Sequence, residues 1–354
     1  MLGHFPRELR ETHDFCTYVR RKVQPHTKFR VSEYSRRLSE ETIFNTPVAL
    51  IIYNRPYHVE RLLSSLRARA PKRLFVIADG PKDNPTDRLN CLKTREALRG
   101  IDWPCEQTYL FADSNMGLRK RVLSGLDAVF KEVDECIILE DDCLVNPSFF
   151  EFAEELLQRY RDSEAVSLIS ALNFAPTKGM TRNTYFAYSG ALIWGWATWA
   201  RVWREFRDSP QRESWSELET EAVRATYPSR LGWRSFSQLM KNARTLNTWD
   251  VSFEVHLRQL GKYSIIPCRN LVTNIGFGKD ATHTKFDSFE VKVPTDDLEF
   301  PLDHPERLQV KPRRERQMWI RRKAKWLWYP ILHPYSTLKS FFDFLLLNLG
   351  KSKS

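Results

Sequence analysis

The 354-residue sequence lacks the short motifs that identify several large classes of enzyme. It contains no G-x-G-x-x-G dinucleotide fingerprint and no G-x-x-x-x-G-K-S/T phosphate loop. Its six cysteines form no C-x-x-C pair and no zinc-type cluster, which favours reduced thiols. No apolar run is long enough to span a bilayer, and the N-terminus lacks the apolar core of a signal peptide. We therefore expect a cytoplasmic protein.

The charge balance is positive, with 55 Lys and Arg against 44 Asp and Glu and a net charge of +11. A surplus of this sign points to an anionic partner such as phosphate groups, nucleic acid or an acidic membrane face. Much of the surplus lies in the two tails, and no nucleic-acid recognition motif is present, so nucleic acid is not the expected partner. A nucleic-acid-binding protein remains the alternative that the charge and the many aromatic residues would support.

The stretch 136–147 carries the strongest chemical signal in the chain. Its apolar run 136–139 is typical of a buried strand and stops on Glu140, Asp141 and Asp142. If the strand continued, its alternation would point Asp141 away from the other two carboxylates. Three adjacent carboxylates repel one another and raise the pKa of at least one, unless a cation lies among them. The pattern predicts a divalent metal on one carboxylate; a solvated acidic turn is the alternative.

Strands and helices alternate over the first half of the chain, which predicts an α/β fold with a parallel sheet and right-handed crossovers. Polar residues follow several predicted strands, among them Arg55, Asp79 and Asn115, and would line one crevice at the carboxyl edge of the sheet. Since no phosphate loop is present, a metal would have to neutralise a bound diphosphate. Strands are predicted at 47–53, 73–78, 108–111, 136–140 and 165–170, and helices from about 59, at 87–99, at 117–133 and at 147–161.

The chain changes character after residue 180. Aromatic residues crowd 185–206, and most of them belong to a core; Trp194 and Trp196, one period apart on a predicted strand face, are the expected binding pair. Residues 207–265 are predicted to be mostly helical, and 267–284 to be a loop.

The C-terminal tail, 311–354, is basic and then aromatic. This composition is typical of an interfacial segment and predicts peripheral association with the inner face of an anionic membrane. A solvated run of charge is the alternative.

Three groups of segments resemble the nucleotide-diphosphosugar transferases of the GT-A fold. ILEDDCLVNPSFFEFAEELLQRY resembles the metal-binding segment of N-acetylglucosaminyltransferase I-like enzymes, and VALIIYNRPYHVERLLSSL and VIADGPKD resemble the nucleotide-binding strands of that group. SGALIWGWATWARVW, TWDVSFEVHLRQLGKYSIIP and NIGFGKDATHT are similar to bacterial family 2-type transferases, some of them called hemolysin-like. The resemblance covers about residues 46–284 and leaves both tails out.

The resemblance implies a GT-A fold, a nucleotide-sugar donor, UDP-sugar above all, and Mn²⁺ or Mg²⁺. It implies a glycan or a lipid-linked molecule as the acceptor. By position, Asp142 would ligate the metal, Glu140 and Asp141 would contact the donor's sugar and ribose, Asp79 would accept the uracil N3–H, and Arg55 would lie on the base and phosphate side. Asp250 falls where inverting members have the catalytic base; a helix-capping aspartate after Thr248 is the alternative.

Three further residues are candidates for donor binding. Asn115 and Arg119 flank Gly117 at a predicted helix N-terminus, where they could contact base or phosphate; capping explains Asn115 nearly as well. His283, in a predicted loop, could reach the diphosphate or the metal. A nucleotidyltransferase of related α/β fold is the alternative enzyme, but it would show a basic, glycine-rich loop that 50–56 lacks. A non-catalytic glycan-binding relative is another.

The length exceeds what one hydrophobic core usually serves, so appendages are expected around a main domain. The predicted organisation is an N-terminal basic helical arm at 1–45, a GT-A domain at 46–284 divided into a nucleotide-sugar half (46–180) and an acceptor half (181–284), a connecting segment at 285–310, and the basic and aromatic tail at 311–354.

Overall fold

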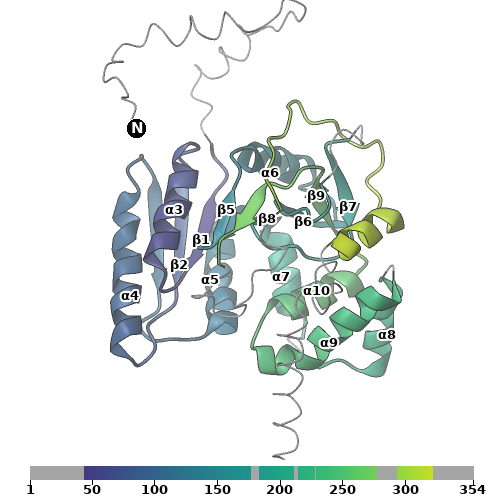
Figure 1. Cartoon of the computed structure of the whole chain (residues 1–354), viewed down its shortest axis with the longest axis horizontal. Coiled ribbons are helices and arrows are strands. Elements are labelled where there is room, and N and C mark those ends of the chain that lie inside the picture. Colours follow the sequence, from purple (N-terminus) through teal and green to yellow (C-terminus); the bar gives the residue numbers. More distant parts are fainter. Residues whose placement is uncertain (1–43, 177–182, 211–213, 228, 277–292, 322–354) are drawn as a thin grey trace, which may run out of the picture. The chain divides into compact units, whose positions relative to one another are not determined.

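The structure is a computed structural model that describes residues 44–176, 183–210, 214–227, 229–276 and 293–321. These residues are organised around an eight-stranded sheet in the order β3-β2-β1-β4-β8-β6-β9-β7 (Figure 1). The strands are β1 (Val48–Ile52), β2 (Arg73–Ala78), β3 (Glu106–Phe111), β4 (Glu135–Glu140), β6 (Val166–Ser170), β7 (Tyr185–Tyr188), β8 (Trp196–Trp199) and β9 (Tyr263–Pro267).

The first half of the sheet is parallel, since β1 pairs in parallel with both β2 and β4, and β2 with β3. Every residue of β1 is buried, which explains its continuous apolar run. Right-handed crossovers put the helices that lead outward to β2 and β3 on one face and the helix that returns to β4 on the other. The predicted α/β fold with a mostly parallel sheet flanked by helices is confirmed. These helices are α3 (Pro56–Arg67), α4 (Pro85–Glu96, followed by the 3-10 turn η1, Ala97–Gly100) and α5 (Leu118–Glu132).

The second half of the sheet is mixed. β8 lies antiparallel between β4 and β6, β6 pairs in parallel with β9, and β7 pairs antiparallel with β9. The region predicted to be mostly helical is helical as far as residue 259, but it ends in strand β9, because Tyr263–Pro267 is too short a run to show a period of its own. The helices are α6 (Ser148–Arg159), α7 (Ala200–Asp208), α8 (Glu217–Ala225), α9 (Arg230–Leu246) and α10 (Asp250–Gln259).

A second sheet of two short strands lies beside the acidic stretch. β5 (Cys143–Val145) pairs antiparallel with β10 (Val272–Asn274). The sequence predicted a loop over 267–284, and this prediction is wrong for β10 at 272–274, while β5 was not predicted. Each strand has three residues, and the partners are more than 120 positions apart, so neither shows a local pattern. The pairing ties the residues after β10 to the acidic end of β4.

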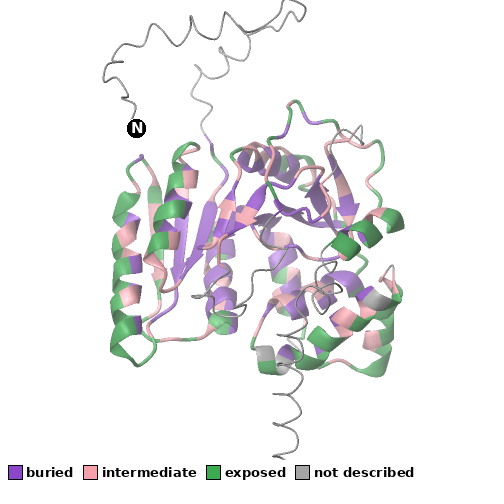
Figure 2. Ribbon diagram, in the orientation of Figure 1, coloured by how far each residue is buried: buried purple, intermediate pink, exposed green. Residues whose placement is uncertain are grey.

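An aromatic cluster fills the core where β8 meets α7 and α10. Trp196 is 1% exposed and stacks on Trp249, with ring centroids 5.9 Å apart. Phe253 contacts both rings and also Phe206. The predicted pairing of Trp194 and Trp196 on a strand face is wrong, because β8 begins at Trp196 and Trp194 precedes it. Figure 2 shows the inner strands of the sheet buried and much of the outer surface of α4, α8 and α9 exposed, whereas the edge strand β3 has no buried residue.

The described part of the C-terminal region packs against the domain. Val310 forms a β-bridge with Ala187, and residues 312–321 are helical. Met318 is buried, and Glu315 accepts a hydrogen bond from the backbone of Ser189 at 2.5 Å. The first residues of the predicted tail therefore belong to the folded domain. Residues 322–354 lie outside the described residues, as do residues 1–43 of the predicted arm and His283.

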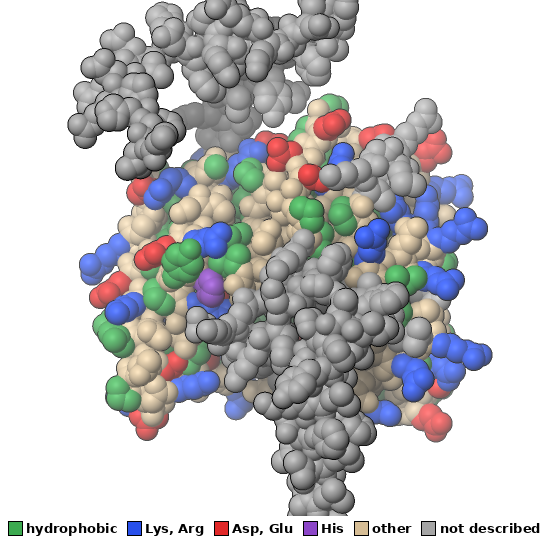
Figure 3. All heavy atoms as spheres, viewed as in Figure 1, with side chains coloured by type: hydrophobic (Ala, Val, Ile, Leu, Met, Phe, Trp, Pro, Cys, Tyr) green, Lys and Arg blue, Asp and Glu red, His purple; other side chains and the backbone are tan. Residues whose placement is uncertain are grey.

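Figure 3 shows charged side chains around the outline of this face, with Lys and Arg gathered along its right side and several Asp and Glu along its top. Within the described ranges, no helix is long and apolar enough to cross a membrane.

Truncation of the aromatic cluster tests this description of the core. Phe253→Ala removes a side chain that is 0% exposed, and it should lower the free energy of unfolding by about 3–5 kcal/mol because a cavity remains. Leu218→Ala, at a position 81% exposed, is the control and should change it by less than about 0.5 kcal/mol. Chemical denaturation measures both. Equal effects of the two substitutions would contradict the packing.

Candidate functional site

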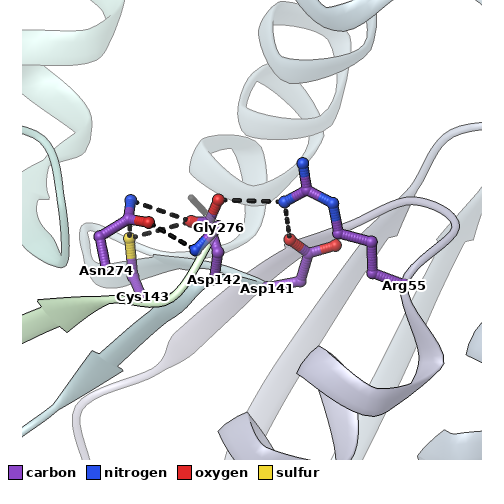
Figure 4. A network of polar contacts seen from close by, with 6 residues as sticks. All are labelled: Arg55, Asp141, Asp142, Cys143, Asn274 and Gly276. Atoms are coloured by element: carbon purple, nitrogen blue, oxygen red, sulfur yellow. Dashed lines mark hydrogen bonds and ion pairs between the residues drawn. The ribbon is translucent and has the colours of Figure 1, made fainter. Parts of the chain in front are cut away.

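The acidic stretch lies at the carboxyl ends of two neighbouring strands. β1 and β4 are parallel, with Ile51 opposite Glu140, so the residues that follow each strand meet at one edge. Arg55, which follows β1, donates from Nη1 to Asp141 Oδ1 at 3.3 Å and to Asp142 Oδ2 at 3.1 Å (Figure 4). The strand ends at Glu140, so the predicted alternation does not extend to Asp141 and Asp142. Instead, both carboxylates reach the same guanidinium nitrogen.

The short β5–β10 pair holds Asp142 from the other side. Asn274 donates from Nδ2 to Asp142 Oδ1 at 3.3 Å, and the Ile275 amide donates to the Asp142 carbonyl at 2.8 Å. Gly276 lies so close that a Cβ at this position would be 2.1 Å from Asp142 Oδ2. Since Arg55 and Asn274 hold the carboxylate, it has little room to retreat. Glycine at 276 is therefore part of what positions Asp142 (Figure 4).

The site carries more negative than positive charge. Burial and the neighbouring carboxylates of Asp142, Asp141 and Asp250 raise the pKa of Glu140 to about 8, against the opposing effect of Arg55. Burial and the charge of Asp142 raise the pKa of Asp141 to about 7. Within the described residues, the Glu140 carboxylate has no hydrogen-bond partner. A further cation at this edge would offset the repulsion among the carboxylates that Arg55 alone does not neutralise.

The residues present fit a divalent cation that is held in part by a ligand. Carboxylate oxygens are the ligands that Mg²⁺ and Mn²⁺ prefer, and Mg²⁺ is commonly bound by one or two carboxylates together with phosphates and waters. Among the residues that the structure describes, no group of three or more His, Cys, Asp and Glu side chains is arranged to hold a metal. Asp142 is the best-placed single ligand, because its carboxylate is held at the edge of the sheet between Arg55 and Asn274.

Asp79 organises the loop between β3 and α5. Its two carboxylate oxygens accept four hydrogen bonds, at 2.8–3.0 Å, and the side chain is 6% exposed. A carboxylate has about four acceptor positions, so those of Asp79 are all in use. A contact with a uracil N3–H would have to replace one of these donors. The donors are the amides of Gly80, Met116 and Gly117 and the side chain of Asn115.

The structure gives Asn115 and Arg119 internal contacts. Asn115 donates to Asp79 and to the Gly80 carbonyl. Arg119 is 9% exposed and donates from Nη1 to the Thr248 carbonyl at 2.6 Å, two residues before the helix that begins at Asp250. Arg119 thus fixes the start of α10 against α5, which positions Asp250.

Asp250 begins helix α10, as the sequence predicted. Its Oδ1 accepts hydrogen bonds from the Thr248 hydroxyl and from the Val251 amide, the latter at 2.9 Å. Oδ2 has no hydrogen-bond partner among the described residues. The charge of Asp250 contributes to the raised pKa of Glu140, so the two carboxylates interact electrostatically. Asp250 also lines a pocket of about 130 Å³ together with Trp194, whereas Trp196 lies in the core.

Two residues of the site were missed by reasoning from the sequence. His58 lies one turn after Arg55 in α3; burial and the charge of Arg55 lower its pKa, while Asp142 opposes this. Its Nδ1 is buried without a partner among the described residues. Asp87 accepts hydrogen bonds from Tyr53 at 2.6 Å and from Asn54 at 2.5 Å, and so fixes the chain after β1. The three-residue spacing from Arg55 could have indicated His58, but nothing local indicates Asp87.

The chain was compared with family models and with solved structures. No family model matches it. It is similar to a UDP-glucose pyrophosphorylase solved with UDP-glucose, at 11% identity and a TM-score of 0.33, over 63% of this chain and 90% of that one. It is similar to a mannosyltransferase from Pyrobaculum calidifontis solved with GDP-Man and Mn²⁺, at 10% identity and a TM-score of 0.34, over 65% of this chain and 75% of that one. It is also similar to apo mouse xyloside xylosyltransferase 1, at 11% identity and a TM-score of 0.33, over 61% of this chain and 81% of that one. Similarity at this level establishes no family and carries no argument about activity.

The raised pKa values of Glu140 and Asp141 predict how stability depends on pH. The unfolded chain has pKa values of about 4 for these groups, so between that pH and about 8 the folded protein binds more protons than the unfolded chain. The melting temperature of the metal-free protein, measured with a chelator, should therefore fall as pH rises through this window. Glu140→Gln should flatten the slope, and the exposed Glu106→Gln should not. Identical slopes for all three proteins would contradict the assignment.

Proposed function

We propose that the protein is a metal-dependent glycosyltransferase that moves a sugar from a nucleotide-diphosphate donor to an acceptor hydroxyl. One observation carries the proposal: Arg55 bridges Asp141 and Asp142 at the carboxyl ends of the parallel strands β1 and β4, and the charge of Asp250 contributes to the raised pKa of Glu140 beside them. Such edges are where open α/β sheets bind ligands. The reaction needs an anion-stabilising centre on the leaving-group side and a base on the acceptor side.

On the donor side, Asp142 would hold Mn²⁺ or Mg²⁺ with the donor's diphosphate. The ion would supply Lewis-acid stabilisation of the departing nucleoside diphosphate. Arg55 adds a second positive charge at the same edge, within hydrogen-bond reach of Asp142 at 3.1 Å. Glu140 and Asp141 would accept hydrogen bonds from donor hydroxyls once ionised. A UDP-sugar is the donor we favour. Asp79 would then accept a hydrogen bond from the uracil N3–H in place of one of its present donors.

On the acceptor side, Asp250 would take the proton from the attacking hydroxyl. Its Oδ1 is held by Thr248 and Val251, so Oδ2 is the oxygen that would accept the proton. Attack from the face opposite the leaving diphosphate would invert the anomeric centre. Arg119 would serve this step indirectly, because its bond to the Thr248 carbonyl fixes the start of α10.

Donor binding is the direct test of the proposal. We expect one nucleotide sugar, tested from a panel of UDP-, GDP- and dTDP-sugars, to raise the melting temperature by several degrees in Mn²⁺ and not in chelator. Asp142→Asn should abolish the rise because it removes the anionic ligand. Gly276→Ala should weaken it, because the added Cβ displaces Asp142.

Glu221→Gln, on the exposed surface of α8, is the control for these variants and should keep the full rise. A rise that persists in Asp142→Asn would sink the metal assignment. Release of pyrophosphate from a nucleoside triphosphate and a sugar 1-phosphate would identify a nucleotidyltransferase instead.

The role of Asp250 is separable from donor binding. Asp250→Asn should keep the donor-induced rise in melting temperature but lower kcat by about 10²–10⁴-fold, because general-base catalysis contributes a factor of that size. The kcat is measured as the rate at which nucleoside diphosphate is released during glycosyl transfer to a sugar acceptor. If the variant retained full kcat, Asp250 would be only the helix-starting residue that its contacts with Thr248 and Val251 also describe.

A further inference from the structure

The pocket next to Asp250 is built from segments that the donor site does not use. It has a volume of about 130 Å³ and is called here the α9–α10 pocket. A cavity of about 150 Å³ in another protein holds a benzene ring, so this volume suits one six-membered ring. The lining residues discussed here are Phe174, Trp194, Tyr227, Phe236, Asp250 and Glu254.

Aromatic rings form much of its wall, and they are held in place. Phe174 meets Trp194 edge to face with centroids 6.0 Å apart, and Tyr227 stacks on Phe236 at 5.2 Å. Flat, braced rings beside a few polar groups are the usual lining of sites for small organic ligands. The C–H face of a pyranose ring is apolar and flat, so it matches such a wall.

Glu254 supplies a second carboxylate in the pocket, beside the proposed base Asp250. It follows Asp250 by four residues on α10, so the two side chains lie on one helix face, and both line the pocket. Glu254 Oε1 accepts from Arg258 Nε at 2.9 Å and from the Tyr227 hydroxyl at 3.0 Å. Oε2 has no hydrogen-bond partner among the described residues, so it is open to a ligand hydroxyl.

The network behind Glu254 holds its carboxylate in place. Arg258 is 4% exposed, its guanidinium lies 4.0 Å from the Tyr227 ring centroid, and its Nη1 donates to the Thr226 hydroxyl at 3.0 Å. Among the described residues that line the pocket, none is Lys, Arg or His. An anionic ligand would therefore meet the carboxylates of Asp250 and Glu254, while Arg258, which pairs with Glu254, does not line the pocket. This arrangement disfavours an anion electrostatically.

We propose that the α9–α10 pocket binds one uncharged sugar ring of the acceptor, with Trp194 against the ring face and Glu254 Oε2 accepting a hydrogen bond from a ring hydroxyl. Glu254 would thereby select neutral over anionic sugars and present a neighbouring hydroxyl to Asp250. The assignment of this sugar as the acceptor rests on the proposed function; the binding site itself does not.

Saturation-transfer NMR on the full chain tests the site without catalysis. The probes are methyl β-D-glucopyranoside and N-acetylglucosamine as neutral rings, and glucuronate as the anionic one, all at millimolar concentration. We expect transfer to a neutral ring and none to glucuronate. Trp194→Ala and Glu254→Gln should weaken neutral binding at least several-fold, whereas Glu221→Gln, an exposed Glu paired with Arg224 on α8, should not change it.

A second variant guards against loss of folding when Glu254 is changed. Tyr227→Phe keeps the ring stack and the charge of Glu254 but removes one hydrogen bond to Oε1, so it should weaken neutral binding less than Glu254→Gln does. Melting temperatures of all variants check that they fold. No transfer to either neutral ring, equal transfer in Trp194→Ala and wild type, or binding of glucuronate as strong as that of the neutral rings would each overturn the inference.

The donor-induced rise in melting temperature, measured on the same proteins, separates this inference from the proposed function. Glu254→Gln should keep that rise in Mn²⁺, because the residue lies outside the donor cluster. Selective binding of neutral sugars with no donor effect in the wild type would overturn the transferase and leave the sugar site standing. A donor effect without selective sugar binding would overturn the sugar site alone.

Discussion

Repulsion among carboxylates at one edge of the sheet is the constraint on which the rest of the site depends. Glu140, Asp141 and Asp142 are consecutive, and the strand end brings them together instead of dispersing them. Arg55 compensates part of this charge from the neighbouring strand, at 3.1–3.3 Å from two of the three carboxylates. Burial and the remaining negative charge raise the pKa of Glu140 and of Asp141, and a bound cation would offset that charge.

Contacts between distant parts of the chain bring the two sides of the site together. The β5–β10 pair places Asn274 and Gly276 against Asp142, while Arg119 in α5 holds the chain that leads to Asp250. The carboxylates of Asp142 and Asp250 are therefore positioned by the same domain core. The stacking of Trp196 on Trp249 also helps to position Asp250, since Trp249 immediately precedes it.

Most of the fold could be predicted because its signals are local. The continuous apolar run of β1, the acidic end of β4 and the helix beginning at Asp250 each depend on a few adjacent residues. The hydrogen bonds of Asp79, Arg119 and Glu254 could not be predicted, since the partners of these residues lie 38, 129 and 27 positions away in the sequence. Similarly, the sequence predicts Trp196 as a binding residue beside Trp194, whereas in the structure β8 begins at Trp196 and places it in the core.

The position of β8 has a consequence for how the chain acquires its shape during synthesis. β8 occupies the place next to β4, although about 60 residues of chain separate the two strands. Until Trp196–Trp199 has been made, β4 exposes the unpaired N–H and C=O groups of one edge, between apolar side chains, to the solvent. A nascent or proteolysed fragment that ends before this strand would keep that edge open and would tend to aggregate, while a fragment that includes it closes the sheet between β4 and β6.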